Sequence, residues 1–455
     1  MLTVLRSSWP LFIGLFMMMI GNGLQGTLLG LRGAMEEFST STMSYVMACY
    51  FAGFLFASRI APRLIRNVGH VRVFAALGSA ISAILILYPT LVEPWAWMLG
   101  RAVIGFCFCG VYITCESWLN DSATNETRGT SLSLYMIVQL AGIVVAQYIV
   151  LLGDIGGYVL FIIPSMLVSL AFAPILLSVG TVPAFAQTKP LPLARLISAS
   201  PLAAVGMFLL GGVFAAQFGM AAVYGAQAGM TVPQISTMIS AIYIAALALQ
   251  YPIGWLSDRM DRRKLIIYIA LAGGIVGLLG MILPGSFIFA VIAAAAIGGA
   301  SNPLYALLIA YGNDYLDRED MAAASGGFLF VNGVGAVFGP ILVGWVMEQF
   351  GPGGYWAYMS LLLLALAAYG LYRMTQRERS AETVADQVPY APVLANASPL
   401  VAEMAQEAYI EAEEEAQAEA AEAQSGAEKG EDGSPLPKDP AFDDAKATDK
   451  PGGDA

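Results

Sequence analysis

The sequence has 455 residues, of which 58% are hydrophobic and only 12% are charged, and its formal net charge is −11. Soluble domains carry about 25% charged residues, so this composition excludes an ordinary soluble protein and indicates one that lies in a lipid bilayer. More than half of the 33 acidic residues lie in 380–455, together with few of the 22 basic ones. The acidity therefore belongs to a tail, and the body before it is mildly basic.

Twelve apolar stretches are long enough to cross a bilayer as helices, which takes about 20 residues because each backbone amide must be satisfied within its own segment. The first stretch is too long for a signal peptide and shows no convincing cleavage site, so we expect an uncleaved first span. The pattern predicts an all-α membrane protein with spans over 9–31, 43–62, 73–91, 96–118, 131–152, 157–180, 202–226, 235–257, 265–283, 286–311, 323–347 and 355–373.

Basic residues alternate from loop to loop. Counted from the N-terminus, every second loop holds nearly all the Lys and Arg of the body, whereas the opposite loops hold only Arg32. Because basic loops stay on the cytoplasmic side, we expect both termini in the cytoplasm. The two densest loops contain Arg59, Arg63, Arg66 and Arg72, and Arg259, Arg262, Arg263 and Lys264.

A second copy of the first half appears when the sequence is shifted by 193 residues. The matches are Gly105, Tyr112, Asn120-Asp121, Glu126, Gln139 and Gly142 with Gly298, Tyr305, Asn313-Asp314, Glu319, Asn332 and Gly335. Two six-helix halves of the same orientation typically enclose a site near the bilayer midplane. We therefore predict an N-terminal half over 1–180, a cytoplasmic linker over 181–200, a C-terminal half over 201–375 and a disordered acidic tail over 376–455.

The loop Gly254–Lys264, with the sequence GWLSDRMDRRK, resembles the loop signature of the major facilitator superfamily between the second and third helices of a half. Its matching positions are Gly254, Asp258, Arg259, Arg262, Arg263 and Lys264, whereas Asp261 stands where the family favours glycine. The stretches 21–32, 66–72 and 116–120 look like the YcaD-like branch of bacterial transporters. The resemblance implies two pseudo-symmetric halves that work by alternating access.

In that family the acid of the signature caps the start of a helix in the other half, where the helix dipole favours a negative charge. The resemblance therefore implies that Asp258 latches onto the start of helix five near 129–132, braced by Arg259 or Arg262. In the first half Arg66 stands opposite Asp258, so we expect a contact of reversed sign. Its basic partner would be Arg63, Arg66 or Arg72, and the acids that it faces before the eleventh span would be Asp317, Glu319 and Asp320. These contacts would hold the cytoplasmic side closed.

Few ionisable residues lie inside the predicted spans, where a charge costs about 3 kcal/mol or more at the centre. Arg101, four residues before Gly105, is similar to the fourth-helix signature of the family, which implies a role in the path of a substrate or proton. The alternative is that Arg101 extends outward toward Glu93. Glu116, near the cytoplasmic end of the same span, is expected to serve as a gate or in packing, paired with Arg128.

Uncharged polar side chains supply a predicted cavity lining. Each of them fits an interhelical hydrogen bond as well as a contact with a ligand. No carboxylate lies deep in a predicted span, which leaves proton coupling open. The candidates are Asn22 and Gln25 on the first span, Gln139 on the fifth, Gln217 on the seventh, Asn302 on the tenth and Asn332 on the eleventh.

We expect a secondary active transporter that moves a small organic solute across the bacterial inner membrane, with export favoured over import. Protons are a candidate coupling ion. We expect the protein to be surrounded by lipids and to be a monomer. The alternative is a membrane sensor that binds a ligand and signals through the tail. No nucleophile and base stand out, so an enzyme is not expected. Four cysteines in apolar runs and a single histidine predict no metal site and no cofactor, and nothing indicates nucleic-acid binding.

Overall fold

A computed structural model describes residues 2–177, 192–282, 286–316, 318–376, 390–394, 401 and 404–405, without the side chains of 2–7, 121–122, 125–126, 175–177, 318–319 and 322. No strand occurs in these residues. The elements are α1 (Leu2–Met35), α2 (Thr40–Val68), α3 (His70–Leu87), α4 (Pro94–Ser122), α5 (Asn125–Ile149), η1 (Val150–Leu152), α6 (Val159–Leu177), α7 (Leu193–Ala199), α8 (Pro201–Ala215), η2 (Ala216–Met220), α9 (Ala221–Gln227), α10 (Val232–Ser257), α11 (Arg262–Ile282), α12 (Phe287–Asn313), α13 (Arg318–Phe350) and α14 (Gly354–Gln376).

Within the described ranges, eleven helical spans are long and apolar enough to cross a membrane, and α6 contributes a shorter apolar stretch, Val159–Pro174. Every predicted span coincides with at least one helix, which confirms the all-α membrane class. The predicted seventh span is built from α8, the π-helical turn η2 and α9. Inside the predicted linker the structure places the short helix α7, which Arg195 ties to Asp320 of α13 through an ion pair of 2.6 Å.

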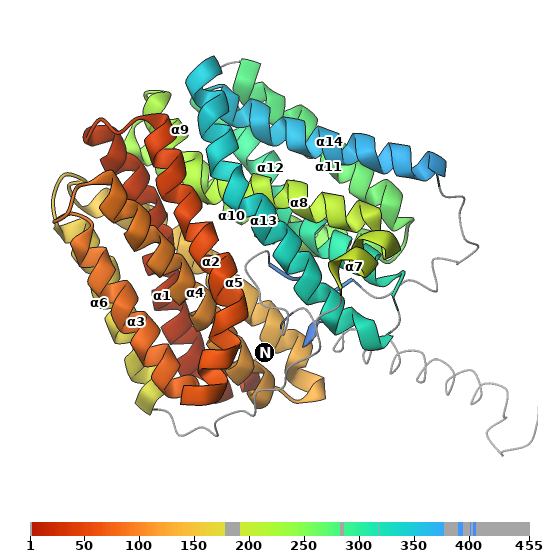
Figure 1. Ribbon diagram of the computed structural model, residues 1–455, viewed down its shortest axis with the longest axis horizontal. Coiled ribbons are helices and arrows are strands. Elements are labelled where there is room, and N and C mark those ends of the chain that lie inside the picture. The colour runs from red at the N-terminus through yellow and green to blue at the C-terminus, as the bar shows by residue number, and fades with distance from the viewer. Residues whose placement is uncertain are drawn as a thin grey trace, which may run out of the picture. The chain divides into compact units, whose positions relative to one another are not determined.

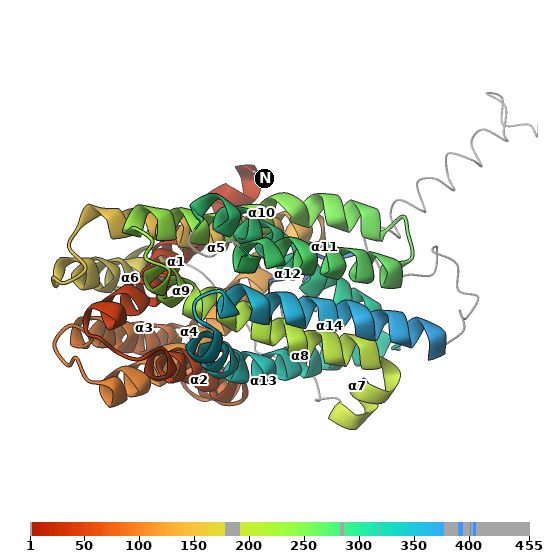
Figure 2. The same cartoon turned by 90° about the horizontal axis from the view of Figure 1, so that it is seen from above.

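The helices α1–α6 and α8–α14 form two groups within the unit Met1–Tyr409 (Figure 1). Helices of one group pack on helices of the other, with α2 against α13, α5 against α10 and α1 against α9 (Figure 2). Within each group the strongest pairings are α2 with α4 and α10 with α12. These last two pairs occupy equivalent positions in the predicted repeat.

Matched glycines lie at matched helix crossings. A Cβ atom at Gly105 of α4 would overlap the carbonyl oxygen of Tyr50 on α2, and one at Gly298 of α12 would overlap the carbonyl oxygen of Ile242 on α10. Helices in a bilayer associate through such close backbone contact, which only small residues permit. The two matched glycines therefore have the same role, which is to allow close packing at equivalent helix crossings.

The second matched pair behaves in the same way. At Gly142 of α5 a Cβ atom would lie 3.1 Å from the carbonyl oxygen of Phe16 on α1. At Gly335 of α13 it would overlap the carbonyl oxygen of Phe208 on α8. The internal repeat that the sequence shows is thus accompanied by equivalent contacts in the folded chain.

One short stretch departs from the disorder that we expected over 376–455. Residues 390–394 are described, and Tyr390 and Leu394 are 4% and 5% exposed. Unlike the acidic repeats that follow it, this stretch belongs to an uncharged sequence, Val388–Leu394. Enough apolar surface is available there to offset the entropy of ordering a few residues.

We predict that Gly105→Ala and Gly298→Ala each destabilise the protein. Each added methyl group meets a backbone carbonyl that cannot rotate away, so the free energy of unfolding should fall by about 1–3 kcal/mol. Thermal unfolding in detergent measures the change. The control is Gly129→Ala, because a Cβ atom at Gly129 meets nothing within 4 Å. Equal midpoints for all three variants would contradict the packing role.

Candidate functional site

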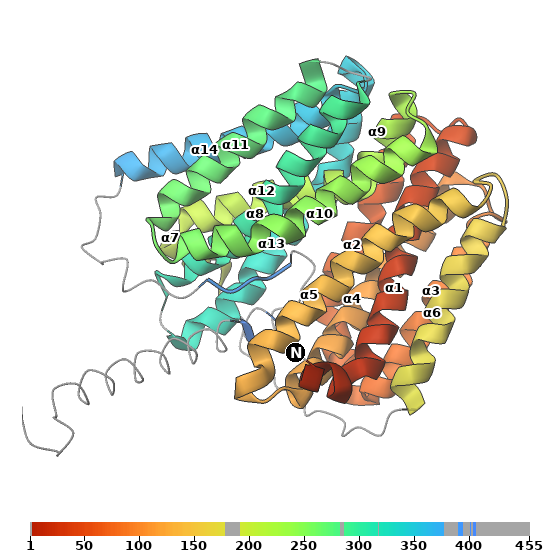
Figure 3. The ribbon, with the colours of Figure 1, turned by 180° about the vertical axis from the view of Figure 1, so that it is seen from behind.

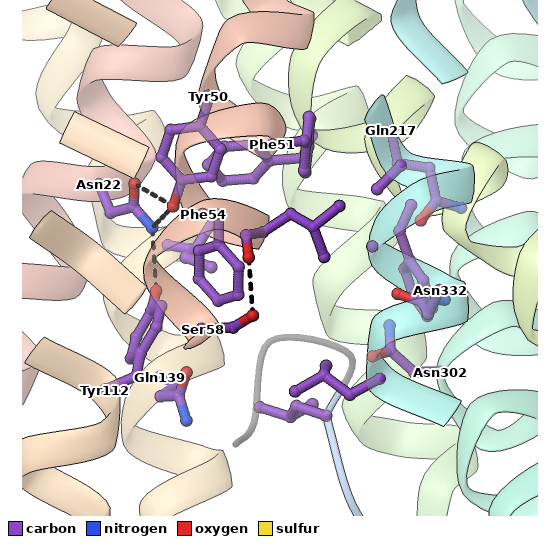
Figure 4. A pocket seen from close by; sticks show the side chains of 18 of the residues that line it. Asn22, Tyr50, Phe51, Phe54, Ser58, Tyr112, Gln139, Gln217, Asn302 and Asn332 are labelled. Atoms are coloured by element: carbon purple, nitrogen blue, oxygen red, sulfur yellow. Dashed lines mark hydrogen bonds between the residues drawn. The ribbon is translucent and has the colours of Figure 1, made fainter. Parts of the chain in front are cut away.

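A cavity of about 130 Å³ lies between the two groups of helices (Figure 4). A single water needs roughly 10–15 Å³ by the same measure, so this cavity has room for a small organic molecule. Among the described residues that line it, none is charged. They are Asn22, Tyr50, Phe51, Phe54, Leu55, Ser58, Tyr112, Gln139, Leu140, Ile143, Phe214, Gln217, Phe218, Tyr243, Asn302, Leu329, Asn332, Gly333, Ala336 and Leu394.

On the side of α1–α6 a hydrogen-bonded group centres on Asn22. Its Nδ2 donates to the hydroxyl of Tyr112 at 3.0 Å, and its Oδ1 accepts from Gln25 Nε2 at 2.9 Å and from the hydroxyl of Tyr50 at 3.4 Å. The three partners come from α1, α2 and α4, and all are buried. Asn22 is thus held by the protein, and Gln25 supports it from outside the cavity lining.

On the other side the carboxamides differ in how they are held. Asn332 Nδ2 donates to the carbonyl oxygen of Met207 at 3.0 Å and so joins α13 to α8. Gln217 exchanges longer hydrogen bonds of 3.3–3.4 Å with the hydroxyl of Ser301. The amide of Asn302 makes no hydrogen bond within the described part of the chain, and it lies at the cavity (Figure 4). Of these three, Asn302 is the one best able to bind a solute.

Aromatic rings form a continuous wall that sequence reasoning missed. The ring centroids of Tyr50 and Phe218 are 5.3 Å apart, those of Tyr50 and Phe54 are 6.3 Å apart, and those of Phe54 and Tyr112 are 6.1 Å apart. Phe218 belongs to η2, and the others belong to α2 and α4. Such π turns occur often at functional sites, and this one places Gln217 and Phe218 at the cavity.

Arg101 is fully buried behind this wall. Its side chain is 0% exposed, and none of its three guanidinium nitrogens makes a hydrogen bond with the described residues. Its Cζ lies 4.6 Å from the ring centroid of Tyr50 and 6.0 Å from that of Phe218. Arg101 therefore does not extend outward to the membrane surface, which was the alternative. Its positive charge is separated from the cavity by the ring of Tyr50.

Arg262 joins three helices at the end of the body where α11 begins. It is 1% exposed, its Nη1 lies 2.7 and 2.8 Å from the two carboxylate oxygens of Asp314, and its Nε donates to the Ser257 hydroxyl at 3.1 Å. Arg259, in contrast, is exposed and folds over the ring of Trp255 at 4.2 Å, and Arg263 is 3.5 Å from Asp261. Of the cluster, Arg262 alone is buried.

Within the described part of the chain, the hydrogen bond and ion pair of Asp258 are made with Tyr390 and Arg262, and neither involves the start of α5. The Oδ1 of Asp258 accepts the backbone N–H of Tyr390 at 3.1 Å and lies 4.0 Å from Arg262 Nη2. Partial burial raises the pKa of this half-buried carboxyl, while the Tyr390 N–H, Arg262 and Arg259 oppose that shift. The latch to 129–132 stays a prediction, and the structure shows the Asp258 carboxylate in another contact.

Of the remaining predicted gate residues, Glu116, Arg128 and Arg66 lie in the first group, and Glu319 lies on α13 of the second. Glu116 is fully buried and accepts the hydroxyl of Tyr135 at 2.7 Å, so it joins α4 to α5. Its pairing with Arg128 stays a prediction. Arg66 is exposed in the last turn of α2, and the side chain of Glu319 lies outside the described residues, so their pairing is also untested. Among the side chains that the structure describes, no group of three or more His, Cys, Asp or Glu could hold a metal ion.

The chain is similar to known membrane transporters. A sequence profile of the Major Facilitator Superfamily matches residues 11–231 and 202–403. "Uncharacterized MFS-type transporter YcaD" from Salmonella arizonae is 24% identical over 360 residues, which cover 77% of this chain and 91% of that protein. An "Uncharacterized MFS-type transporter" from Yersinia pestis is 25% identical over 398 residues, covering 84% and 97%. A crystal structure of a mutant of the nucleoside transporter NupG has a TM-score of 0.67 at 15% identity, covering 81% of this chain and 99% of that one.

We predict that Arg262→Ala is strongly destabilising, because it removes the guanidinium group that pairs with the mostly buried carboxylate of Asp314. Breaking a buried ion pair from one side typically costs about 3–5 kcal/mol. Thermal unfolding in detergent gives the measurement. Arg259→Ala in the same loop removes an exposed charge and should change stability by less than about 1 kcal/mol. The role of Arg262 is wrong if the two variants unfold at the same temperature.

Proposed function

The chain belongs to the major facilitator superfamily of multi-pass membrane transporters, and we propose that it moves a small uncharged organic solute by alternating access, as a secondary active transporter. We further propose that the solute carries a flat ring and several hydrogen-bonding groups. The observation that carries this proposal is the cavity between α1–α6 and α8–α14, whose described lining combines aromatic rings with carboxamides and holds no charge.

The absence of charge among the described lining residues favours an uncharged solute. Moving an ion from water into a cavity costs several kcal/mol unless an opposite charge and hydrogen bonds compensate for the lost hydration. The described lining offers amides and hydroxyls, which satisfy a neutral polar molecule at lower cost. Arg101 is a buried charge outside this lining, and the ring of Tyr50 packs against its guanidinium group.

The aromatic wall favours a flat ring in the solute. The wall presents large apolar ring faces from Tyr50, Phe51, Phe54 and Phe218. The interaction with such a face is most favourable when another planar group stacks on it. Opposite them Asn302 offers an amide that can donate and accept at once. Small-molecule sites commonly have this composition, with apolar walls for affinity and a few polar groups for orientation.

Alternating access requires that one end of the cavity be closed while the other is open. At the end where α2 begins, the two groups touch closely: Gln227 Nε2 donates to the hydroxyl of Thr40, and a Cβ atom at Gly30 would lie 2.7 Å from the Cβ of Ala222. We propose that this end faces away from the cytoplasm. The other end, which carries the basic loops, would then face the cytoplasm, as the positive-inside rule predicts.

The direction that we propose is export, with protons as the candidate coupling ion. Because no carboxylate lines the described part of the cavity, Arg101 is the group on which such coupling would depend. A proton that reached the wall would change the hydrogen bonds of Tyr50 and Asn22, which lie between Arg101 and the solute. Flux with and without a pH gradient, measured in both directions, tests coupling and direction together.

We predict that Asn302→Ala lowers solute flux without changing thermal stability. The amide of Asn302 has no described partner inside the protein, so the hydrogen bond that the variant loses is one to the solute. A hydrogen bond of about 1 kcal/mol corresponds to roughly a fivefold change in affinity. The assay is uptake into proteoliposomes across a panel of neutral, anionic and cationic solutes. Asn332→Ala is the matched control. It removes the hydrogen bond between Asn332 of α13 and the Met207 carbonyl oxygen of α8, so this variant should unfold at a lower temperature.

The proposed function fails if no solute of the panel crosses the membrane. Flux restricted to charged solutes would contradict the inference drawn from the lining. The rival function, a membrane sensor, predicts specific binding of a solute to the purified protein together with no flux in any direction. Binding and flux measured on the same preparation therefore separate the two functions.

We predict that Arg101→Leu raises thermal stability while it lowers flux at least tenfold. Removing an unpaired buried charge recovers a desolvation cost of several kcal/mol, which exceeds the cation–π contribution of about 2 kcal/mol or less that is lost. Unfolding in detergent and uptake into proteoliposomes are both measured. A variant that is less stable and transports normally would show that Arg101 is a structural residue.

A further inference from the structure

The structure points to a binding site for the chain's own C-terminal segment at the mouth of the cavity. We propose that Tyr390–Leu394 is an internal plug, which docks in a slot on α10 and blocks the path between the cavity and the end of the body that carries the basic loops. The inference rests on the proposed function only in so far as that path carries the solute. The plug is defined by residues 390–394 and the slot by Gln250, Gly254 and Asp258.

The slot binds Tyr390 at three successive turns of one helix face, because its residues are spaced by four. The Nε2 of Gln250 donates to the Tyr390 hydroxyl at 2.8 Å, and Asp258 Oδ1 accepts the Tyr390 backbone N–H at 3.1 Å. Between them a Cβ atom at Gly254 would lie 2.6 Å from Cδ1 of the Tyr390 ring. The glycine thus leaves the space that the ring fills, and Gln250 is itself 3% exposed.

The other end of the plug lies between the two groups of helices. Leu394 is 5% exposed and packs with Met136 and Leu140 of α5 and with Tyr243 and Leu247 of α10. It is also one of the residues that line the cavity. Figure 3 shows the segment between α5 and α13. A solute that enters or leaves from this end must pass the plug or displace it.

Docking of the plug also opposes closure of this end. Closure of this end would bring together the parts of α5 and α10 that flank the plug, and in this structure Leu394 packs on both, against Leu140 of α5 and Tyr243 of α10. Asp258 accepts the Tyr390 N–H through Oδ1, so the docked plug uses the side chain that the predicted latch to 129–132 would also need. The plug and the latch therefore compete for Asp258, and a docked plug favours the state in which this end is open.

The plug is tethered to the end of α14 at Gln376 by the 13 residues 377–389. A tether of this length keeps a ligand at an effective concentration on the order of millimolar, so weak contacts suffice to keep the slot occupied. Release then requires a competitor for the segment or for the slot. The device would set the basal activity of the transporter.

The first test uses the full chain with Ser58→Cys as a reporter, because Ser58 lines the cavity. Labelling of this thiol by a maleimide in detergent is compared with and without Tyr390→Ala. We expect the variant to label about tenfold faster, since the plug no longer covers the mouth. Tyr372→Ala is the matched control, as Tyr372 is exposed on α14. Equal labelling rates in all three proteins would overturn the plug, whether or not a solute is ever found.

The second test joins plug and slot covalently. In the full chain with Gly254→Cys and Tyr390→Cys, oxidation should form a disulfide, slow the labelling of Ser58→Cys at least tenfold and reduce solute flux to background, and a reductant should restore both. Because oxidation traps even brief visits of a tethered thiol, and the variant needs no Tyr390 ring for such visits, the absence of a disulfide would mean that the segment does not reach the slot. A disulfide with unchanged labelling would mean that it docks without blocking. A disulfide that slows labelling in a protein with no flux in any form would uphold the plug and reject the proposed function.

Discussion

The core of a bilayer contains no water, so helices there satisfy their own backbone groups and adhere through close contact instead of through the exclusion of water. In this protein glycines allow such close backbone contact at helix crossings, among them Gly105 of α4 on α2 and Gly298 of α12 on α10. Everything that we assign to function depends on these two crossings. They position α2, which carries the aromatic wall of the cavity, and α10, which carries the slot for Tyr390.

Two buried arginines illustrate two ways to place a guanidinium group in such a body. Arg262 is paired with Asp314 and bonded to Ser257, so its charge is neutralised where three helix ends meet. Arg101 has aromatic neighbours instead, with Tyr50 and Phe218 facing its charge. A buried ion pair with good geometry is compatible with a stable fold. A buried charge without an ion-pair partner destabilises the protein, so such a residue is by default a functional candidate.

The cavity and the plug use the same helices for different purposes. Along α10, Tyr243 faces the cavity, and Gln250 and Asp258, further toward the basic loops, hold the segment around Tyr390. The uncharged lining suits a neutral solute, and the polar contacts at the mouth suit a backbone amide and a phenol. A single helix thus connects solute binding to the contact that would close the path, which makes α10 the element through which the two states would be coupled.

The sequence by itself determined the class of protein, the order of the membrane helices and the superfamily, because bilayer thickness fixes helix length and leaves a readable apolar run for each span. It also pointed to the carboxamides of the cavity. Only the tertiary structure showed that Asn332 joins two helices while Asn302 faces the cavity, that η2 interrupts the seventh span, and that Tyr390 docks on α10. Those facts depend on contacts between residues such as Gln250 and Tyr390, 140 positions apart. Helical periodicity carries no information about such distant partners, because it reports the faces of one segment and not its neighbours.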